Sequence, residues 1–337
     1  MIHFRNDYND IAHPKIIKHM QQCMDETHLG YGMDEHSKKA RERIQELISI
    51  PVFIHFMVGG TSTNKIVISH ILKPYEAVIS AQTGHIEVHE TGAIESTGHK
   101  IITIPTDDGK LTVELIKKAY TRYTDEHMVK PKLVYLSQAT ETGYIYQKDE
   151  LKDIYNLCQS LEMYLFIDGA RLGVSLTAEQ NGLTIDDHAK YSDVFYIGGT
   201  KNGAMLGEAL ITKHPSIDNY LRYSMKQGGG LLAKGFLIGM QFEALFEDQL
   251  FFEIGAKANQ MANYLKEKLK VHQIIFNETP TNQQFIKLPN QVIEKLNQKY
   301  TFETWEDHGS SKTIRLVTNY RTQKSDIDQL ILDIKNK

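Results

Sequence analysis

The chain has 337 residues, of which 41% are hydrophobic and 24% charged, and its formal net charge is −4. This balance is typical of a soluble globular protein with one large and one smaller domain, and it gives a nucleic-acid partner no electrostatic support. The longest uncharged apolar stretch, residues 50–58, is too short to cross a membrane, and the N-terminus has no apolar segment of a signal peptide.

The first two thirds of the chain alternate between helical periodicity and short apolar runs. In chain order, these patterns predict a helix at 13–23, a loop at 30–34, a helix at 37–48, a strand at 52–58 and a turn at 59–62 that leads into a helix running to about 72. They then predict strands at 77–80 and 101–104, a helix at 112–123, a strand at 133–137, a helix at 148–161, and strands at 164–167, 194–197 and 209–212. Such alternation predicts a mostly parallel sheet with helices on both faces.

The last third of the chain has a different pattern. It predicts helices at 236–246 and 254–269, a strand at 284–288, a helix at 291–298, a strand at 313–318 and a last helix at 325–334. These elements form an α+β unit. We therefore predict a large domain over residues 1–240 and a small C-terminal domain over residues 241–337.

Two of the predicted strands end in a reactive polar residue that is followed by glycines. Asp168 follows the strand at 164–167, and Lys201 follows the strand at 194–197. Ligands of open α/β sheets bind at the carboxyl ends of strands, so both side chains are expected in one crevice. Asp before Gly is also a common turn former, and a Lys after a strand is often surface charge. The apolar run before Asp168 and the glycines around Lys201 favour the functional interpretation.

An Asp and a Lys in one crevice suit pyridoxal phosphate as a cofactor. The Lys amine can form a Schiff base with the aldehyde, and the Asp carboxylate can keep the pyridine nitrogen protonated, which makes the ring an electron sink. A desolvated Lys beside a cation has a lowered pKa, so Lys201 is expected to offer a neutral amine. His85 and His89 are spaced so that two imidazoles could lie on one helix face, as in a metal site, but the sequence His-Glu-x-x-His is absent and no Cys or carboxylate cluster at metal-ligand spacing supports the pair. No metal site is therefore predicted.

Two segments are specific in combination: residues 168–171, Asp-Gly-Ala-Arg, and residues 315–318, Arg-Leu-Val-Thr. With them the chain resembles the low-specificity threonine aldolase and beta-eliminating lyase family, which belongs to the fold-type I pyridoxal phosphate enzymes. The resemblance covers residues 4–318. It implies an aminotransferase-like α/β fold, a Schiff base at Lys201 and a contact of Asp168 with the cofactor ring.

The turn at residues 59–64, Gly-Gly-Thr-Ser-Thr-Asn, follows a strand and opens a helix. Backbone N–H groups at a helix N-terminus attract anions, although the turn could be an ordinary one capped by Thr. The resemblance implies that Gly60 and Thr61 hold the cofactor phosphate. It also implies that His85 stacks on the pyridine ring and that Glu90 is a carboxylate near the substrate.

Substrate recognition is expected to depend on arginines. Arg315 lies in an alternating strand, where a lone Arg usually faces solvent, and Arg171 lies at a predicted helix start, where a cation opposes the helix dipole. The resemblance implies that Arg315 clamps the α-carboxylate of an amino acid through two hydrogen bonds. It also implies that Arg171 lies near that carboxylate and near the ring oxygen of the cofactor. It places Asn6 at the position of a carboxylate-binding Ser.

Two positions depart from the family pattern. Thr140 stands where aldolases carry a His near the substrate hydroxyl, and Glu141, Glu90 or water would have to accept that proton. Leu232 stands where a phosphate-binding Arg serves the neighbouring subunit. Lys234 is the nearby cation expected to replace it. Tyr31 and Lys234 both lie on Gly-rich loops far from Lys201 in sequence, which suits residues offered across a subunit interface.

We therefore predict a cytoplasmic pyridoxal phosphate lyase, a homodimer or homotetramer, that cleaves β-hydroxy-α-amino acids such as threonine or allo-threonine to glycine and an aldehyde. The scarcity of cysteines, Cys23 and Cys158 alone, agrees with a reducing compartment. Alternatives with the same cofactor are a β-eliminating lyase, a racemase or an aminotransferase. A further alternative is a cofactor-binding scaffold without catalysis, suggested by the missing base at position 140.

Overall fold

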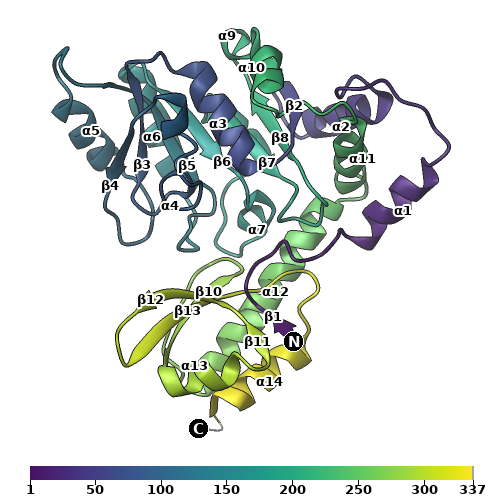
Figure 1. The fold of residues 1–337 in the computed structure, drawn as a ribbon, viewed down its shortest axis with the longest axis vertical. Helices are drawn as coiled ribbons and strands as arrows, with labels where there is room; N and C mark the ends of the chain where they lie inside the picture. The colour runs from purple at the N-terminus through teal and green to yellow at the C-terminus, as the bar shows by residue number, and fades with distance from the viewer. Residues whose placement is uncertain (336–337) are drawn as a thin grey trace.

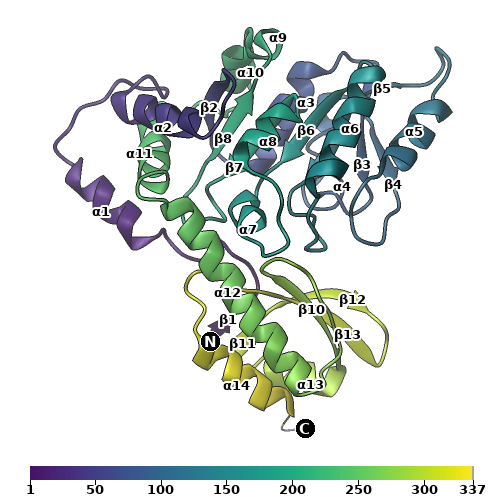
Figure 2. The same cartoon turned by 180° about the vertical axis from the view of Figure 1, so that it is seen from behind.

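The computed structural model describes residues 1–335. It has a large unit and a small unit, and the long helix α12 (Leu250–Val271) runs from one to the other (Figures 1 and 2). The N-terminus and the last described helix, α14 (Lys324–Lys335), both lie in the small unit (Figure 1). Within the described residues, no helix is long and apolar enough to span a membrane.

A seven-stranded sheet in the order β2-β8-β7-β6-β5-β3-β4 is the centre of the large unit. Its strands are β2 (Phe53–Met57), β3 (Glu76–Ala81), β4 (Ile101–Ile104), β5 (Lys130–Ser137), β6 (Tyr164–Asp168), β7 (Val194–Gly198) and β8 (Glu208–Thr212). Only β8 runs antiparallel to its neighbours, so the predicted mostly parallel sheet is confirmed. The carboxyl ends of the other strands therefore meet at one edge.

Helices pack on both faces of this sheet because successive strand residues point to opposite faces and both faces are apolar. In β5, for example, Leu133 and Tyr135 join one buried cluster, and Val134 and Leu136 join the other. The helices of the large unit are α1 (Pro14–Gln22), α2 (Glu35–Glu46), α3 (Gly60–Ile71), α4 (His85–Val88), η1 (Glu95–Thr97), α5 (Val113–Arg122), α6 (Lys148–Ser160), α7 (Leu172–Leu176), α8 (Ile185–Lys190), α9 (Pro215–Asp218), α10 (Leu221–Gln227) and α11 (Phe236–Leu245).

The small unit is an antiparallel sheet in the order β12-β13-β10-β9 covered by helices. Its elements are β9 (Phe276–Asn277), β10 (Gln283–Pro289), α13 (Asn290–Leu296), β12 (Glu303–Asp307), β13 (Ser311–Val317) and α14 (Lys324–Lys335), together with the short parallel pair β1 (Ile2–His3) and β11 (Tyr300–Thr301). Phe4 from the N-terminal segment is buried in its core. The strands predicted at 284–288 and 313–318 and the helices predicted at 291–298 and 325–334 are present, and the strands β1, β9, β11 and β12 are additions that the sequence did not predict.

The domain boundary predicted at residues 240/241 lies inside α11, which packs on α1 and α2 of the large unit. The core changes along α12 instead, because Ile254 belongs to the core of the large unit and Met261 to that of the small unit. We propose that the division falls within α12, with the first residues of the chain joining the small unit.

Candidate active site

Asp168 is the last residue of β6, and Lys201 follows the end of β7 by three residues. The loops that follow β6 and β7 approach each other so closely that no side chain fits at Gly169 or Gly198. A Cβ atom on Gly169 would lie 1.9 Å from the carbonyl oxygen of Tyr196, and one on Gly198 would lie 2.4 Å from that of Ala170. Glycines at these positions let both loops reach one crevice, as the sequence predicts.

The crevice is a cavity of about 290 Å³, and its lining includes Tyr8, Gly60, Thr61, His85, Asp168 and Lys201. It therefore joins residues from the N-terminal segment, the start of α3, α4 and two strand ends. A larger cavity of about 500 Å³ lies against β4 and α5, but it is lined by apolar and basic residues, without a carboxylate or an imidazole among the described residues. The smaller cavity holds the reactive groups.

Asp168 is buried and fixed by hydrogen bonds. Its Oδ2 accepts from the Tyr135 hydroxyl and, at 3.1 Å, from Nδ2 of Asn64, while its Oδ1 accepts from the backbone N–H of Ala170 at 3.0 Å. Burial opposes ionisation, but His85 and the Tyr135 hydroxyl outweigh it and lower the pKa of Asp168. The cavity therefore contains an ionised, immobile carboxylate.

Lys201 has the properties of a nucleophilic amine. Desolvation in the cavity and the nearby Arg171 guanidinium lower its pKa, although carboxylates around it oppose the shift. Glu208 is buried beside it, and burial raises the pKa of Glu208 to about 8. This carboxyl is therefore mostly neutral at pH 7 and adds little charge that would keep Lys201 protonated.

His85, Glu90 and Asn64 form a hydrogen-bonded chain that leads to Asp168. Oε1 of Glu90 contacts Nδ1 of His85 at 2.8 Å and accepts from Nδ2 of Asn64 at 2.8 Å. Burial lowers the pKa of His85, but the Glu90 hydrogen bond and the charges of Glu141 and Asp168 outweigh this effect and raise it. Glu90 thus orients the imidazole that lines the cavity.

The first turn of α3 opens at the cavity. Gly59 precedes the helix without a side-chain cap, and the Oγ atom of Ser62 is buried without a hydrogen-bond partner among the described residues. A Cβ atom on Gly60 would lie 3.2 Å from the Tyr196 hydroxyl, so the cavity narrows there around a bare backbone. Free N–H groups and hydroxyls at a helix N-terminus are the donor set that a phosphate requires.

Arg171 lies at the start of α7, where a positive charge opposes the helix dipole. The carboxylate of Asp7 neutralises this charge. The two side chains form a buried two-point pair, with Nε–Oδ2 at 2.8 Å and Nη2–Oδ1 at 3.1 Å. Burial opposes the ionisation of Asp7, but the charges of Arg171 and Lys201 lower its pKa. Nη1 of Arg171 lies 3.9 Å from Oε2 of Glu141.

Arg315 is only 6% exposed, because β13 lies between β10 and β12 in the small sheet. Its Nη1 donates to Oε1 of Gln283 at 3.0 Å, Nη2 pairs with Glu303, and its guanidinium lies 5.3 Å from the centre of the Trp305 ring. Nε is buried and has no partner among the described residues. Burial and, after it, the charge of Arg171 lower the pKa of Arg315, so the two guanidinium groups lie near each other.

Six predicted site residues do not line this cavity within one chain. Glu90, Arg171 and Arg315 are buried close to it, whereas Asn6, Tyr31 and Lys234 make other contacts. Asn6 is half-buried, and its Oδ1 accepts from the backbone N–H of Tyr8 at 3.2 Å. Tyr31 and Lys234 are exposed on two loops that touch, since the N–H of Tyr31 donates to the Ala233 carbonyl at 3.0 Å. Tyr31 and Lys234 thus form a surface of their own, and their roles stay predictions.

Thr140 is held by contacts with its own loop and with the loop between β4 and α5, in which Asp108 lies. Its Oγ1 donates to the Asp108 carbonyl at 3.0 Å and contacts Oγ1 of Thr142 at 3.0 Å. The neighbouring Glu141 is buried beside Arg171, and no hydrogen bond to its carboxylate occurs among the described residues. Of the two, Glu141 has the freer polar group.

Several residues of the site were not singled out from the sequence. Tyr135 and Tyr196 lie in strands as apparent core residues, yet their hydroxyls bond Asp168. Asn64 joins Glu90 to Asp168, and Asp7 neutralises Arg171. The signal that could have found Asp7 is the unpaired charge of Arg171 at a helix start, which requires a buried carboxylate.

The geometry fits pyridoxal phosphate: a helix N-terminus for its phosphate, an ionised carboxylate for its ring nitrogen, and a desolvated lysine for its aldehyde. Fold and site together define a fold-type I pyridoxal-phosphate-dependent enzyme. A model of the beta-eliminating lyase family matches residues 4–291, and the chain belongs to that family.

Comparisons with individual proteins agree with this placement. A low specificity L-threonine aldolase of a Pseudomonas species is 30% identical over 91% of this chain and 89% of its own. A solved structure of Leishmania major threonine aldolase is 45% identical, covers 99% of each chain and superposes with a TM-score of 0.97. Thermus thermophilus aspartate aminotransferase, at 13% identity, with 99% of this chain and 90% of that one covered and a TM-score of 0.75, shares the fold alone.

Proposed function

We propose that the protein is an aldolase that cleaves β-hydroxy-α-amino acids, such as threonine and allo-threonine, to glycine and an aldehyde. The observation that carries this proposal is the convergence of Lys201, Asp168 and His85 on one cavity in a chain 45% identical to a threonine aldolase over its whole length. The nearby Arg171 and Arg315 supply the cations that an amino-acid substrate needs.

Pyridoxal phosphate, when bound, withdraws electrons from the bonds at the substrate Cα through its protonated ring. We assign the aldehyde contact to Lys201, the ring nitrogen to Asp168 and the ring face to His85. Gly60 and Thr61 would hold the phosphate. Asp168 is suited to its role because its hydrogen bonds already fix an ionised carboxylate.

The α-carboxylate of the substrate is assigned to Arg315, with Arg171 nearby and Asn6 assisting. Both arginines have a carboxylate partner, Asp7 for Arg171 and Glu303 for Arg315, but Arg315 keeps a buried donor, Nε, without a partner among the described residues. A carboxylate provides the acceptor that such a donor lacks. Arg315 is therefore assigned as the principal clamp.

Cleavage of the Cα–Cβ bond takes a proton from the β-hydroxyl and delivers one to Cα. Thr140 is a poor acceptor because it is a neutral hydroxyl engaged by Asp108. Glu90 is engaged by His85 and Asn64. We therefore propose that Glu141, whose carboxylate is buried beside Arg171, accepts the proton of the β-hydroxyl.

Product analysis on the purified protein tests the proposed reaction. The protein is incubated with L-threonine, L-allo-threonine, L-serine and L-alanine, and glycine, acetaldehyde, keto acids and D-amino acids are measured. Stoichiometric glycine and acetaldehyde from either threonine isomer is the expected result. A keto acid without glycine would indicate elimination or transamination, a D-isomer would indicate racemisation, and no turnover by a protein that carries the cofactor would indicate a scaffold.

Arg315→Leu is expected to raise the KM for threonine roughly ten- to hundredfold, because a charge-assisted hydrogen bond is worth about 1.5–3 kcal/mol. The absorbance of the bound cofactor should not change. Initial rates against substrate concentration measure the effect. Arg321→Leu is the matched control, since Arg321 pairs with Asp10 on the surface. An unchanged KM in Arg315→Leu would remove this residue from the substrate site.

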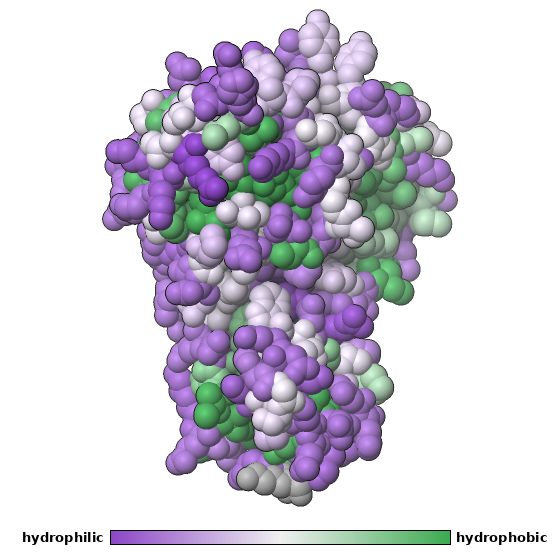
Figure 3. Space-filling model, turned by 60° about the vertical axis from the view of Figure 1, so that its left-hand side comes forward, coloured by the Kyte–Doolittle hydropathy of each residue, from purple (hydrophilic) through white to green (hydrophobic). Residues whose placement is uncertain are grey.

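We propose that the enzyme is at least a homodimer, with Tyr31 and Lys234 of one chain completing the cavity of the other. Both side chains are exposed on adjoining loops, and neither lines the cavity of its own chain. Large apolar side chains close to Tyr31 or Lys234 in the sequence are also exposed: Met33 at 61%, Tyr220 at 66% and Tyr223 at 75%. Figure 3 shows hydrophobic residues at the surface of the large unit. Such surfaces are typical of contacts between chains.

Mixing Lys201→Ala and Lys234→Ala chains is expected to restore activity that each variant lacks. One of the two cavities in a hybrid dimer would hold an intact Lys201 and receive an intact Lys234. Mixing Lys201→Ala with His85→Ala is the control, because both residues line the same cavity of one chain and no hybrid cavity is intact. A fully active monomer by light scattering would contradict the proposal.

We also propose a cytoplasmic location for the enzyme. Its two cysteines, Cys23 and Cys158, are both buried and unpaired, which suits a reducing compartment. Fractionation of the source cells with an antibody against the protein tests this location.

A further inference from the structure

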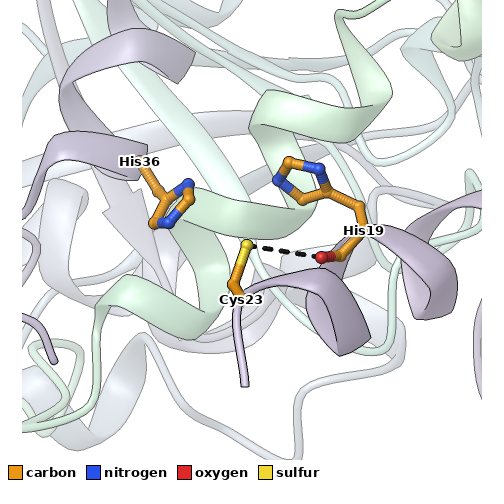
Figure 4. Close-up of side chains that lie close together, drawn as sticks. All are labelled: His19, Cys23 and His36. Atoms are coloured by element: carbon orange, nitrogen blue, oxygen red, sulfur yellow. Dashed lines mark hydrogen bonds between the residues drawn. The ribbon is translucent and has the colours of Figure 1, made fainter. Parts of the chain in front are cut away.

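A second cluster of polar side chains lies outside the cavity, where α1, α2 and α11 meet. His19 belongs to α1, Cys23 is the residue that ends this helix, and His36 lies in the first turn of α2. Figure 4 shows the Cys23 sulfur pointing into the space between the two imidazole rings. Spacing of four residues places His19 and Cys23 on one face of α1.

The ligand atoms of these three residues are close enough to share one ion. One ring nitrogen of each histidine and Sγ of Cys23 all lie within 4.8 Å of one another. The carboxylate of Glu243, from α11, is a fourth candidate, because its Oε2 lies 3.3 Å from Nε2 of His19 and also contacts Nδ1 of His36. In a tetrahedron with bonds of about 2.0–2.3 Å, neighbouring ligand atoms lie roughly 3.3–3.8 Å apart.

A second group of donors adjoins the first through His36. The ligand atoms of Glu26, His28 and His36 also lie within 4.8 Å of one another. Nε2 of His36 contacts Oε2 of Glu26 at 2.9 Å, and Nε2 of His28 lies 3.9 Å from the same oxygen. The His28 side chain is only 8% exposed, and its Nε2 is buried without a hydrogen-bond partner among the described residues.

Ion pairing alone accounts for only part of this arrangement. Glu243 is buried and attracts His36, His19 and Lys39, so a charged network would explain these residues. It gives no role to the buried Cys23 thiol, whose Sγ donates a weak bond to the His19 carbonyl at 3.3 Å. A zinc ion would use that thiol as a ligand.

We propose that this cluster is a zinc site in which His19, Cys23, His36 and Glu243 bind one Zn²⁺, with Glu26 and His28 beside it. Thiolate, imidazole and carboxylate together match zinc, whereas calcium and magnesium require oxygen ligands. Binding releases the thiol proton of Cys23 to solvent. Four protein ligands leave no open position, so the role is structural.

The zinc ion would hold α1, α2 and α11 together, and α11 packs against the loop that carries Lys201. Gly239 of α11 packs against Ser37 of α2, since a Cβ atom there would lie 2.2 Å from the Ser37 Oγ. Phe242, next to Glu243, lies against Gly199 in the loop that carries Lys201. Zinc would therefore hold α1 and α2 against the helix on which the Lys201 loop rests.

Metal titration of the full-length, cofactor-loaded protein tests the proposal. After chelator treatment and desalting, the protein is expected to bind one Zn²⁺ per chain with a Kd on the order of 1 µM or tighter, measured by competition with a chromogenic chelator. Zinc in excess should raise the Tm by about 5 °C. Co²⁺ bound to the wild-type protein should give the visible absorption bands of a tetrahedral thiolate site. This measurement requires no variant. Failure of the wild-type protein to bind either ion would overturn the proposal.

Variants separate this site from adventitious binding. Cys23→Ser and His36→Gln are each expected to weaken zinc binding at least about tenfold, since even changes beyond the ligands cost 10- to 100-fold. Cys158→Ala and His127→Gln are the matched controls, because these residues lie outside the cluster. Zinc binding that survives Cys23→Ser and His36→Gln would also overturn the assignment.

Discussion

Replacing Lys201 by alanine is expected to abolish covalent attachment of the cofactor and to reduce kcat at least about a thousandfold. Lys201 is the lysine that lines the cavity with Asp168, and its pKa is lowered by desolvation and by Arg171. The purified variant should therefore lack the yellow absorbance of the lysine-bound cofactor. Spectra and initial rates of threonine cleavage measure the two effects.

A lowered pKa by itself does not identify the nucleophile, and a second lysine tests this point. Burial also lowers the pKa of Lys213, but its Nζ donates to the Lys190 carbonyl at 2.7 Å and lies outside the cavity. Lys213→Ala should keep the absorbance and the activity. Borohydride reduction of the wild-type protein followed by peptide mapping should label Lys201, and label on another lysine would contradict the assignment.

The fold could be predicted in outline because its long elements carry strong periodic signals. The helices at α3, α6 and α12 and the strands of the large sheet lie within a few residues of their predicted positions. The short helices α7–α10 were missed, because four to seven residues do not complete two helical turns. Strand β12 (Glu303–Asp307) was missed because its sequence, Glu-Thr-Trp-Glu-Asp, is mostly polar and lies at a sheet edge.

The central residues of the site could be predicted because each follows a strand. Strand ends of a parallel sheet meet at one edge, so Asp168 and Lys201 come together from local patterns alone. The residues that tune them could not be found in this way. Tyr135 looks like any core residue of a strand, and Asp7 lies 164 residues from Arg171. Such pairs depend on tertiary packing, which has no local pattern.

The proposed zinc cluster shows the same limit. His19 and Cys23 are four residues apart, but His36 and Glu243 come from two other helices. Glu243 is 207 residues from His36 in the sequence. The sequence alone predicts no metal site, because His85 and His89 have no further ligands at metal-ligand spacing. The three helices had to be packed together before the donors could be seen as one group.

Replacing Asp168 by asparagine is expected to lower kcat at least about 100-fold, equivalent to roughly 2.7 kcal/mol of transition-state stabilisation, and to weaken cofactor binding. Asparagine keeps the size of the side chain but removes the negative charge that holds a proton on the ring nitrogen. The cavity would then bind the neutral ring, which withdraws electrons poorly. Cofactor titration and threonine cleavage rates measure both effects.

Loss of activity in this variant must be separated from damage to the fold, because Asp168 also accepts hydrogen bonds from Tyr135, Asn64 and Ala170. Asp193→Asn provides the comparison. Asp193 is buried just before β7, at the opposite end of the sheet, and accepts from the Leu165 N–H at 2.7 Å. Its replacement should lower the Tm and leave the cofactor spectrum intact. Asp168→Asn with near-normal turnover would show that the carboxylate charge does not assist the reaction, because the amide preserves shape and removes only that charge.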